Sequence, residues 1–432
     1  MAATLAPNFR NDERGSIAIM FGLMFMVIMS IAGLALDYSR ILLARHALND
    51  AADAAGVAVG RAMVDGKVTK ADAIKIGEVY FAENAKGVNK VGGLVPLPHI
   101  TADAATSTVT VTAQIDLPMT LMAVAGFKNM TIPTTSTVAY DAKDLEVGMA
   151  LDITGSMAEV PPGGGPRKID GLKTAFQKFA ETLIPVTPQL DRKVRIGVMP
   201  FSASVNLGKY AAAASSNRSK DGCVTERNTP SYSDKSPVIG GYFEVASDGV
   251  SNIDPTEGGV GSNRYYCPSP SVMPLTDDRN ALVTQVNTFQ AGGYTAGHLG
   301  VQWGWNLIAE DYGSFWGGNS APAPYADTQG PKPKLIKAMI LMTDGIFNTS
   351  YHDDIARNQA LAMCSAMKAK GVLVFTIGFG LGNVGSEIVA KQTLKDCATP
   401  GARYFADASN TADLDAALQS FASILSQLRV TQ

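Results

Sequence analysis

The sequence has no excess of basic residues, no C-x-x-C pair and no regular repeat of glycine or proline. Its 432 residues include 36 Lys and Arg against 39 Asp and Glu, for a formal net charge of −3, which excludes the basic surface that nucleic-acid binding requires. The 42 glycines and 22 prolines have no period, so we expect long loops rather than collagen or a repeat array. The histidines have no metal-ligand spacing: His46, His99, His298 and His352.

The cysteines are few and widely spaced. With no C-x-x-C pair and no histidine nearby, Cys223, Cys267, Cys364 and Cys397 disfavour a structural zinc site. Their even number fits two disulfides in an oxidising compartment, whereas in the cytoplasm all four would be free thiols. Three pairings are compatible with the sequence, and order along the chain favours Cys223 with Cys267 and Cys364 with Cys397.

The run from Ser16 to Leu36 carries no charge and spans about 30 Å as a helix, the thickness of a bilayer's hydrocarbon core. A cleaved signal peptide is the alternative, but the run is longer than a signal-peptide core and lacks a clear cleavage site before Asp37. We expect a cytoplasmic segment 1–15, a transmembrane helix 16–36 and an exported remainder. The positive-inside rule does not decide, because two arginines flank each end: Arg10, Arg14, Arg40 and Arg45.

Residues 37–142 are predicted to form a small helix-plus-hairpin stalk. The helical spacing of the apolar run continues beyond Asp37, and a second helix is expected over Ala71–Asn84. Alternation at every second residue predicts strands at Ser107–Leu117 and Thr131–Tyr140, joined by the short apolar segment Met119–Phe127.

The first sixty residues resemble the N-terminus of TadG-like proteins of the tight-adherence (Flp) pilus assembly systems. The resemblance includes Arg14-Gly15 before the apolar run, the DYSR of Asp37–Arg40 and the LNDAADAA of Leu48–Ala55. It implies a role in assembling or anchoring a pilus. Related minor pilins carry a Glu five residues beyond the Gly, which prepilin peptidase and pilin packing use. Met20 holds that place here, so we expect an uncleaved anchor.

Residues 145–432 are predicted to form an α/β domain with a doubly wound, mostly parallel sheet and helices on both faces. Near-continuous apolar strands alternate with amphipathic helices, which indicates a sheet covered on both sides. Two irregular insertions are expected, 207–275 and 313–334. The expected strands are 146–151, 194–201, 335–342 and 372–377, and the expected helices are 168–183, 298–308, 355–369 and 414–428.

An aromatic cluster overlaps the second insertion. Trp303 is expected in the core of the domain, because it lies on a predicted helix. The part of the cluster beyond Asp311 is flanked by glycines, and an exposed contact surface is the alternative there. The members of the cluster are Trp303, Trp305, Tyr312, Phe315 and Trp316.

Hydroxyl and carboxylate side chains gather where the predicted strands end. Asp152, Thr154 and Ser156 follow the first strand at every second position, Thr295 lies in a loop that leads to a helix, and Asp344 ends a later strand. Ligands bind in the crevice at the carboxyl ends of the strands in open α/β sheets. We therefore expect these five side chains to form one site.

This set resembles the metal-ion-dependent adhesion site of von Willebrand factor type A domains, whose pattern is Asp-x-Ser-x-Ser, then a Thr, then an Asp. Thr154 replaces the middle Ser and keeps the hydroxyl. The resemblance implies a von Willebrand A-like domain that binds Mg²⁺ or another divalent cation. It also implies that Ser156, Thr154 and Thr295 touch the ion directly, while Asp152 and Asp344 supply charge behind them.

The chemistry of Mg²⁺ suits such a site. The ion prefers octahedral oxygen ligands and keeps some of its waters, so hydroxyls and one or two carboxylates are sufficient. Neutral ligands leave the ion electron-poor, and an acidic side chain of a partner can complete its shell. The alternative is a set of ordinary turn and cap residues, because Asp, Ser and Thr favour helix N-termini. Three segments in order, each at a strand end or helix start, favour the metal site.

Two stretches are similar to parts of enzymes. The sequence after Asp152 is similar to the phosphorylated DKTGT loop of P-type ATPases, but the Lys and final Thr are absent and one span cannot form a pump. Gly380–Gly385 reads GLGNVG, and Asp407 ends the next strand at a distance that suits a ribose contact. The chain after Asp407 is too short for the second mononucleotide-binding half of a dinucleotide-binding fold. We therefore interpret Gly380–Gly385 as a structural turn, and we expect no catalysis.

The sequence therefore predicts a membrane-anchored pilus assembly or anchoring component that acts through metal-dependent protein contacts. The expected partners are other pilus-system proteins or an acidic protein ligand, with one helix in the membrane and no nucleic acid. The expected location is the inner (cytoplasmic) membrane, with the C-terminal domain in the periplasm or outside. The alternative is a surface adhesin that binds a host or matrix ligand through the metal site and the insertions.

Overall fold

A computed structural model describes residues 14–65, 68–94, 97–103, 106–124, 126–140, 143–184, 193–228, 233–245, 266–331, 333–351 and 355–430. The chain forms two compact units, Met1–Tyr140 and Asp141–Gln432.

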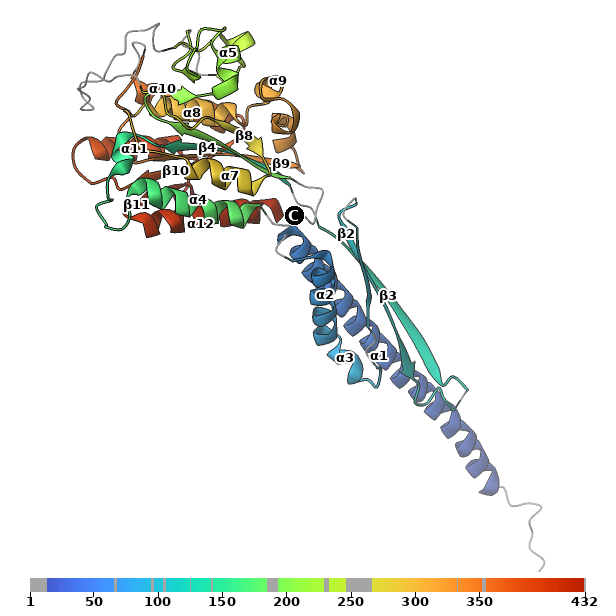
Figure 1. Ribbon diagram of the computed structural model, residues 1–432. Helices are drawn as coiled ribbons and strands as arrows, with labels where there is room; N and C mark the ends of the chain where they lie inside the picture. Colours follow the sequence, from blue (N-terminus) through green and yellow to red (C-terminus); the bar gives the residue numbers. More distant parts are fainter. Residues whose placement is uncertain are drawn as a thin grey trace, which may run out of the picture. The chain divides into compact units, whose positions relative to one another are not determined.

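One helix of 52 residues, α1 (Arg14–Asp65), organises the first unit (Figure 1). A second helix and a three-stranded antiparallel sheet pack along it. The expected helix and hairpin are present. The sequence did not predict the first strand of the sheet, because five residues are too few to show a clear alternation of apolar and polar side chains. The elements are α2 (Lys70–Asn84), α3 (Lys86–Asn89), β1 (His99–Asp103), β2 (Thr108–Pro118) and β3 (Asn129–Ala139).

Small side chains on α1 allow this close packing. Ala51, Ala52 and Ala55 are fully buried, and a Cβ atom added at Gly56 would come within 2.6 Å of the Val138 side chain on β3. The alternating residues of β2 face the helix, since every second side chain in its first half is buried. The alanine-rich face of α1 therefore packs against the chain's own sheet and second helix.

The first part of α1, up to Leu36, differs from the rest of the helix because its apolar side chains are not covered by other elements of this unit. Its large apolar side chains between Ile17 and Leu36 are exposed on this unit. In the part of the chain that the structure describes, α1 is the one helix that is long and apolar enough to cross a membrane.

Parallel strands form the centre of the second unit. The strand order is β11-β10-β9-β4-β5, with every neighbouring pair parallel. Three short strands extend the β5 edge in antiparallel pairing. The strands are β4 (Asp144–Asp152), β5 (Val194–Phe201), β6 (Val205–Asn206), β7 (Cys223–Val224), β8 (Met273–Thr276), β9 (Leu335–Thr343), β10 (Leu373–Phe379) and β11 (Phe405–Ala408). The chain winds outward in opposite directions from β4 and β9, so these neighbours flank the switch point where such folds bind ligands.

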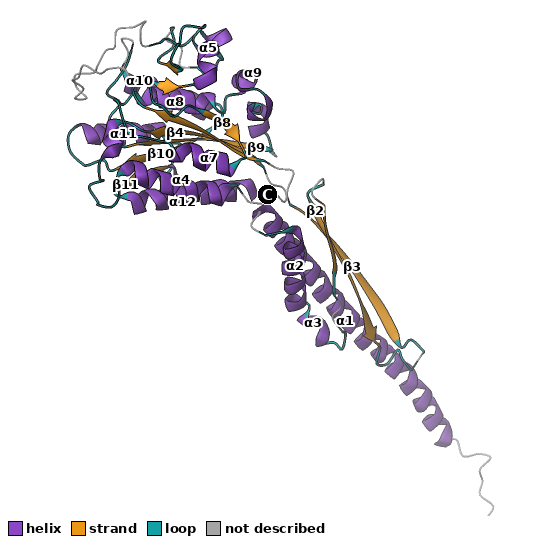
Figure 2. Ribbon diagram, in the orientation of Figure 1, coloured by secondary structure: helices purple, strands orange, loops and turns teal. Residues whose placement is uncertain are grey.

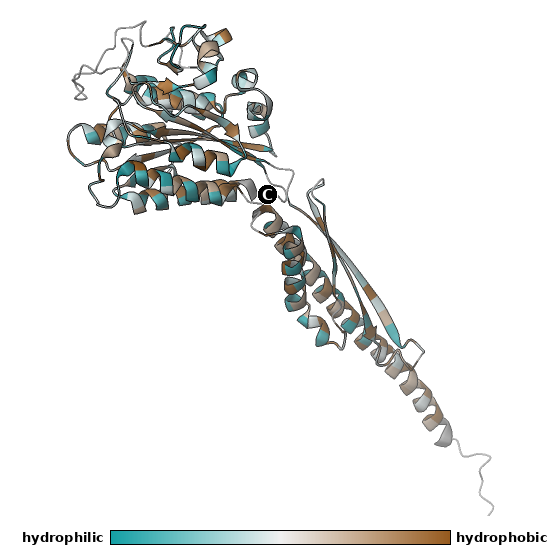
Figure 3. Cartoon of the chain, in the orientation of Figure 1, coloured by the Kyte–Doolittle hydropathy of each residue, from teal (hydrophilic) through white to brown (hydrophobic). Residues whose placement is uncertain are grey.

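Helices cover both faces of the sheet (Figure 2). α8 (Gly297–Asn306), α10 (Ala356–Ala369) and α11 (Ser386–Cys397) contribute to the hydrophobic core on one face. The core on the other face includes α4 (Lys168–Leu183), α7 (Arg279–Asn287) and α12 (Thr411–Val430). The strands between the two cores are mostly hydrophobic (Figure 3). The predicted doubly wound α/β fold, with a mostly parallel sheet covered by helices on both faces, is therefore confirmed.

The first insertion contains more structure than the sequence predicts. An irregular segment was expected over 207–275, but it includes β7, α5 (Ala211–Ala214), α6 (Pro237–Gly240) and most of β8. β8 belongs to the main sheet, so the expected boundary at Leu275 is wrong. The strand escapes detection because it has four residues, one of them proline, and pairs with β5 across a register shift.

The disulfides join Cys223 to Cys267 and Cys364 to Cys397. The pairing favoured by order along the chain is thus confirmed. The first bond lies within the first insertion, and the second joins α10 to the last residue of α11.

The aromatic cluster is mostly core. Trp303, Trp305 and Tyr312 are fully buried, and Trp316 beyond Asp311 is buried to 5% exposure. An exposed contact surface in this segment is therefore wrong. The rings of Trp303, Tyr312 and Trp316 pack on one another, which explains why glycine-flanked aromatics lie inside.

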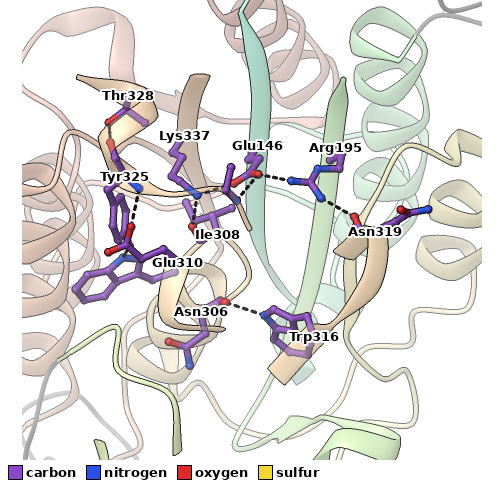
Figure 4. A network of polar contacts seen from close by, with 12 residues as sticks. Glu146, Arg195, Asn306, Ile308, Glu310, Trp316, Asn319, Tyr325, Thr328 and Lys337 are labelled. Carbon is purple, nitrogen blue, oxygen red and sulfur yellow. Dashed lines mark hydrogen bonds and ion pairs between the residues drawn. The ribbon is translucent and has the colours of Figure 1, made fainter. Parts of the chain in front are cut away.

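A buried polar network joins the second insertion to the central strands, near the amino ends of these strands (Figure 4). Glu146 on β4 accepts hydrogen bonds from Lys337 Nζ at 2.6 Å and from the Ala323 N–H at 2.9 Å, and it pairs with Arg195. Burial lowers the pKa of Lys337, and the charge of Glu146 opposes that shift. Glu146 lies near the amino end of β4, and Asp152 is its last residue. The network is therefore at the opposite end of the strands from the candidate site.

Candidate metal centre

Asp152 is the last residue of β4 and is fully buried. One carboxylate oxygen accepts a hydrogen bond from the Thr154 N–H at 2.8 Å, which closes a tight turn. The other accepts from the Thr343 hydroxyl at 2.5 Å, at the end of the neighbouring strand β9. The carboxylate therefore ties the ends of two adjacent strands.

Ser156 connects this turn to Asp344. It lies in a short 3-10 helix, Gly155–Ala158, directly after the turn. Its Oγ is 3.1 Å from Thr154 Oγ1 and donates to Asp344 Oδ1 at 2.7 Å. Two hydroxyls and one carboxylate from separate strand ends thus form a continuous chain of oxygen atoms.

Thr295 approaches the same place from the loop before α8. Its N–H donates to Asn348 Oδ1 at 2.9 Å, and its carbonyl accepts from the Asn348 N–H at 3.0 Å. A Cβ atom added at Gly345 would lie 3.5 Å from Thr295 Oγ1, so the Thr295 hydroxyl is beside the residue that follows Asp344. Asn348 therefore aligns the loop of Thr295 with the loop of Asp344.

The turn after β4 and the loop before α8 are also joined by their backbones. The Gly155 N–H donates to the Gly293 carbonyl at 2.9 Å, and the Gly292 N–H donates to the Ile153 carbonyl at 2.8 Å. Gly293 adopts φ +80°, a conformation that favours glycine. The structure therefore brings together all five predicted residues on loops that hold one another.

A lysine that the sequence analysis missed lies inside this cluster. Lys168, at the start of α4, places Nζ 2.8 Å from Asp344 Oδ2, with side-chain exposures of only 6% and 0%. Gly380 makes room for it, because a Cβ there would come within 2.9 Å of Lys168 Cε. A signal existed in the sequence: Lys168 falls on the stripe of α4 that also carries the buried Leu172 and Ala175.

The electrostatics of the cluster favour an added cation. Burial and then the charge of Asp344 raise the pKa of Asp152 to about 7. Burial also raises the pKa of Asp344, although the Lys168 ammonium opposes this shift. Both carboxyls therefore hold their protons to a higher pH than an exposed carboxyl does, because the nearby positive charge does not offset their burial. A divalent cation would supply that charge.

The residues present fit a hard divalent ion. Three hydroxyls and two carboxylates from three separate loops offer oxygen atoms alone, which suits Mg²⁺ and disfavours softer metals that prefer sulfur and nitrogen. Sequence reasoning found these five residues but missed the three that support them: Lys168, Thr343 and Asn348.

The glycine-rich turn after β10 has a structural explanation. Gly380 and Gly385 both adopt positive φ, at +67° and +54°. Asp407, the candidate for a ribose contact, accepts a hydrogen bond from Lys391 Nζ at 2.8 Å, and the same ammonium donates to Asn383 Oδ1 at 2.9 Å. The carboxylate of Asp407 is therefore bound by the helix that follows the turn.

Comparison with solved structures gives only distant similarities. The vWF domain of the type V pili tip protein Mfa5 from Porphyromonas gingivalis is 12% identical, with a TM-score of 0.40, over 67% of this chain and 97% of that chain. The pilus adhesin SpaC from Lactobacillus rhamnosus GG is 11% identical, with a TM-score of 0.39, over 77% of this chain. The match spans about a third of SpaC's length, 34%.

A third similar structure is the proximal thread matrix protein 1 from the mussel byssus, whose MIDAS motif is occupied by zinc. It is 16% identical, with a TM-score of 0.32, over 65% of this chain and 47% of that chain. No curated protein matches the sequence.

A family model matches the N-terminal segment. It is described as "Putative Flp pilus-assembly TadE/G-like", and it covers residues 15–62. These residues include the apolar part of α1 and the DYSR and LNDAADAA segments on which the predicted resemblance depends. The N-terminal segment of this chain is thus TadE/G-like, as its sequence predicted.

Proposed function

We propose that this protein is a membrane-anchored component that assembles or anchors a tight-adherence pilus through metal-dependent protein contacts. The observation that carries the proposal is the chain of oxygen atoms from Thr154 through Ser156 to Asp344, at the switch point of the sheet. The TadE/G-like segment supplies the pilus context.

The ion would be Mg²⁺ or another divalent cation. Thr154, Ser156 and Thr295 would offer their hydroxyls, with Asp152 and Asp344 supplying negative charge. When bound, the ion supplies an electron-poor coordination position that an acidic side chain of a partner protein can fill. The proposed role is binding without catalysis. Asp407, the candidate for a ribose contact, accepts a hydrogen bond from Lys391.

The anchor would be the apolar part of α1, and the second unit would lie in the periplasm or outside. The exposed apolar side chains between Ile17 and Leu36 support a helix that meets lipid. The two disulfides support an oxidising compartment for the second unit. Location in the inner membrane is part of this proposal.

Metal-dependent stability tests the site. We expect Mg²⁺ to raise the melting temperature of the full chain in detergent, and we expect Thr154→Val or Thr295→Val to remove most of that shift. Thr376→Val is the matched control, because this buried threonine on β10 bonds to Leu394 instead. If Thr154→Val and Thr295→Val retained the Mg²⁺ shift of the unmodified chain, the assigned ligands would be wrong.

A surface adhesin remains the alternative, with a host or matrix ligand bound through the metal site and insertions. Genes for a pilin, a secretion ATPase and a prepilin peptidase beside this gene favour pilus assembly. A gene that lies without them favours adhesion.

A further inference from the structure

The loop between β2 and β3 exposes apolar side chains at its tip. Val124 is 86% exposed, Phe127 is 62% exposed and Leu121 is 39% exposed. The loop lies beside α1, which continues beyond it as a helix without the sheet (Figure 1). Contiguous exposed apolar side chains are typical of membrane or protein contact sites, so the tip of this loop is a candidate for such a contact.

Asp37 on α1 fixes the position of this loop. Its carboxylate is fully buried and accepts hydrogen bonds from three consecutive backbone N–H groups, at 3.1 Å from Thr120, 2.9 Å from Leu121 and 2.7 Å from Met122. The Thr120 hydroxyl donates to it at 2.7 Å. The loop is therefore held on the helix by four hydrogen bonds to one side chain.

The loop overlaps the end of the apolar run. A Cβ atom added at Gly33 would come within 2.6 Å of the Leu121 Cβ, so Leu121 packs directly on Gly33. Gly33 lies about 5 Å before Leu36, where the uncharged run ends, at the helical rise of 1.5 Å per residue. A bilayer that covers the run as far as Leu36 must therefore also meet the loop.

The backbone of the loop suits an apolar environment. The N–H groups of Leu121 and Met122 bind Asp37, and those of Val124, Gly126 and Phe127 donate to carbonyl groups of the loop itself, at 3.1 Å each. Irregular backbone at membrane depth is costly unless such groups are satisfied within the protein. Five N–H groups of the loop, those of Leu121, Met122, Val124, Gly126 and Phe127, meet this requirement.

The side chains around the tip suit the boundary between lipid headgroups and acyl chains. Exposed Lys128 follows Phe127, and Met130 on β3 is also exposed. Phe and Leu side chains enter the boundary between headgroups and acyl chains, and the ammonium of a neighbouring lysine reaches the headgroups.

We propose that the exposed apolar side chains of the loop between β2 and β3, Leu121, Val124 and Phe127, form a second membrane contact, inserted into the headgroup boundary of the bilayer that α1 spans. The proposal rests on the membrane anchor of the proposed function. It extends the anchor from a single helix to a helix and a loop joined by Asp37.

Site-directed spin labelling tests this contact. All four cysteines are in disulfides, so one introduced cysteine is the only free thiol. Val124→Cys would carry a nitroxide in the full chain, reconstituted in vesicles of phosphatidylcholine and phosphatidylglycerol. Collisions with oxygen and with a water-soluble nickel complex then report depth. We expect the oxygen-to-nickel ratio at Val124 to be several-fold above that of a water-exposed site.

Two further labels give the reference depths. Ile28→Cys lies in the apolar run and reports the bilayer interior. Val79→Cys reports water, because the Val79 side chain is 61% exposed on α2. Gly77, two residues earlier on α2, packs on Val59, which lies about 39 Å along α1 from Gly33.

The outcomes separate the two proposals. A Val124 label as accessible to nickel as the Val79 label, with Ile28 protected, would overturn the loop contact and leave the anchor. An Ile28 label accessible to nickel would overturn both. Protection of Val124 that appears only after other pilus proteins are added would identify a protein surface as the occupant and overturn the lipid contact.

Discussion

At the scale of single residues, Lys168 determines the charge that a metal ion meets. Its ammonium is bound to Asp344 and buried with it, so one of the two carboxylates is already neutralised. Removing one member of a buried pair leaves an uncompensated charge and costs about 3 kcal/mol or more. Lys168 therefore stabilises the site without metal and competes with an ion for Asp344.

Replacing Lys168 by methionine should make the metal-free protein less stable and its binding of Mg²⁺ tighter. We expect Lys168→Met to lower the free energy of unfolding without Mg²⁺ by about 3 kcal/mol. We expect the same change to tighten Mg²⁺ binding at least about tenfold, because two charges near 4 Å apart interact by about 4 kcal/mol at an effective dielectric constant of 20. Chemical denaturation and calorimetric titration measure the two effects.

Lys391→Met is the matched control. It removes a lysine that pairs with Asp407 outside the cluster, so it should leave Mg²⁺ affinity unchanged. An unchanged or weaker Mg²⁺ affinity in Lys168→Met would show that the ammonium does not oppose the ion.

Asp152 makes the effect of Mg²⁺ depend on pH. Its pKa is raised to about 7 by burial and by Asp344, against about 3.9 in an unfolded chain. Between about pH 4 and pH 7, Asp152 is protonated in the folded protein and ionised in the unfolded chain. Without metal, the contribution of Asp152 to the free energy of unfolding therefore decreases as the pH rises through this range. Mg²⁺ needs the ionised carboxylate, so its stabilisation should grow over the same window.

Melting temperatures with and without Mg²⁺ between about pH 5.5 and pH 8 measure this dependence. We expect a larger Mg²⁺ shift at the higher pH. Asp152→Asn cannot ionise and should abolish both the shift and its pH dependence. A Mg²⁺ shift that is equal at both ends of the range would contradict the raised pKa.

At the scale of helices and strands, the sequence predicts the strands that carry the proposed metal ligands. It misses short strands such as β8, which pairs with β5 at the edge of the sheet. Apolar runs locate β4 and β9 because central parallel strands are buried on both faces. The short β8 has no comparable pattern. Asn348 and Lys168 were also missed, because their partners Thr295 and Asp344 are distant in sequence and only the fold brings them together.

The position of Thr295 depends on how closely α8 packs on β4. A Cβ atom added at Gly148 on β4 would come within 2.2 Å of the Gly304 carbonyl oxygen on α8. Backbone cannot yield as a flexible side chain does, so Gly148→Ala should displace the helix and cost about 1–3 kcal/mol of stability. Because Thr295 lies in the loop that enters α8, the Mg²⁺ shift should also decrease.

Thermal unfolding with and without Mg²⁺ measures both effects of Gly148→Ala. Gly313→Ala is its control, since nothing lies within 4 Å of a Cβ atom there and alanine is no worse than glycine in a helix. If Gly148→Ala kept the full stability and Mg²⁺ shift, close packing of α8 would not position Thr295.

At the scale of the whole molecule, the disulfides and the proposed topology depend on each other. Cys223–Cys267 and Cys364–Cys397 leave no free thiol in the chain. Such bonds form in oxidising compartments and are rare in the cytoplasm. An exported second unit therefore predicts two formed bonds, and a cytoplasmic second unit predicts four thiols.

A single cysteine at Val238 tests topology and disulfides together. Val238 is 94% exposed on α6, so Val238→Cys should not disturb folding. In spheroplasts, a membrane-impermeant maleimide should label this variant before lysis and should leave the unmodified chain unlabelled, even after denaturation without reductant. Labelling of Val238→Cys only after lysis, with additional labelling of the native cysteines in the denatured chain, would place the second unit in the cytoplasm.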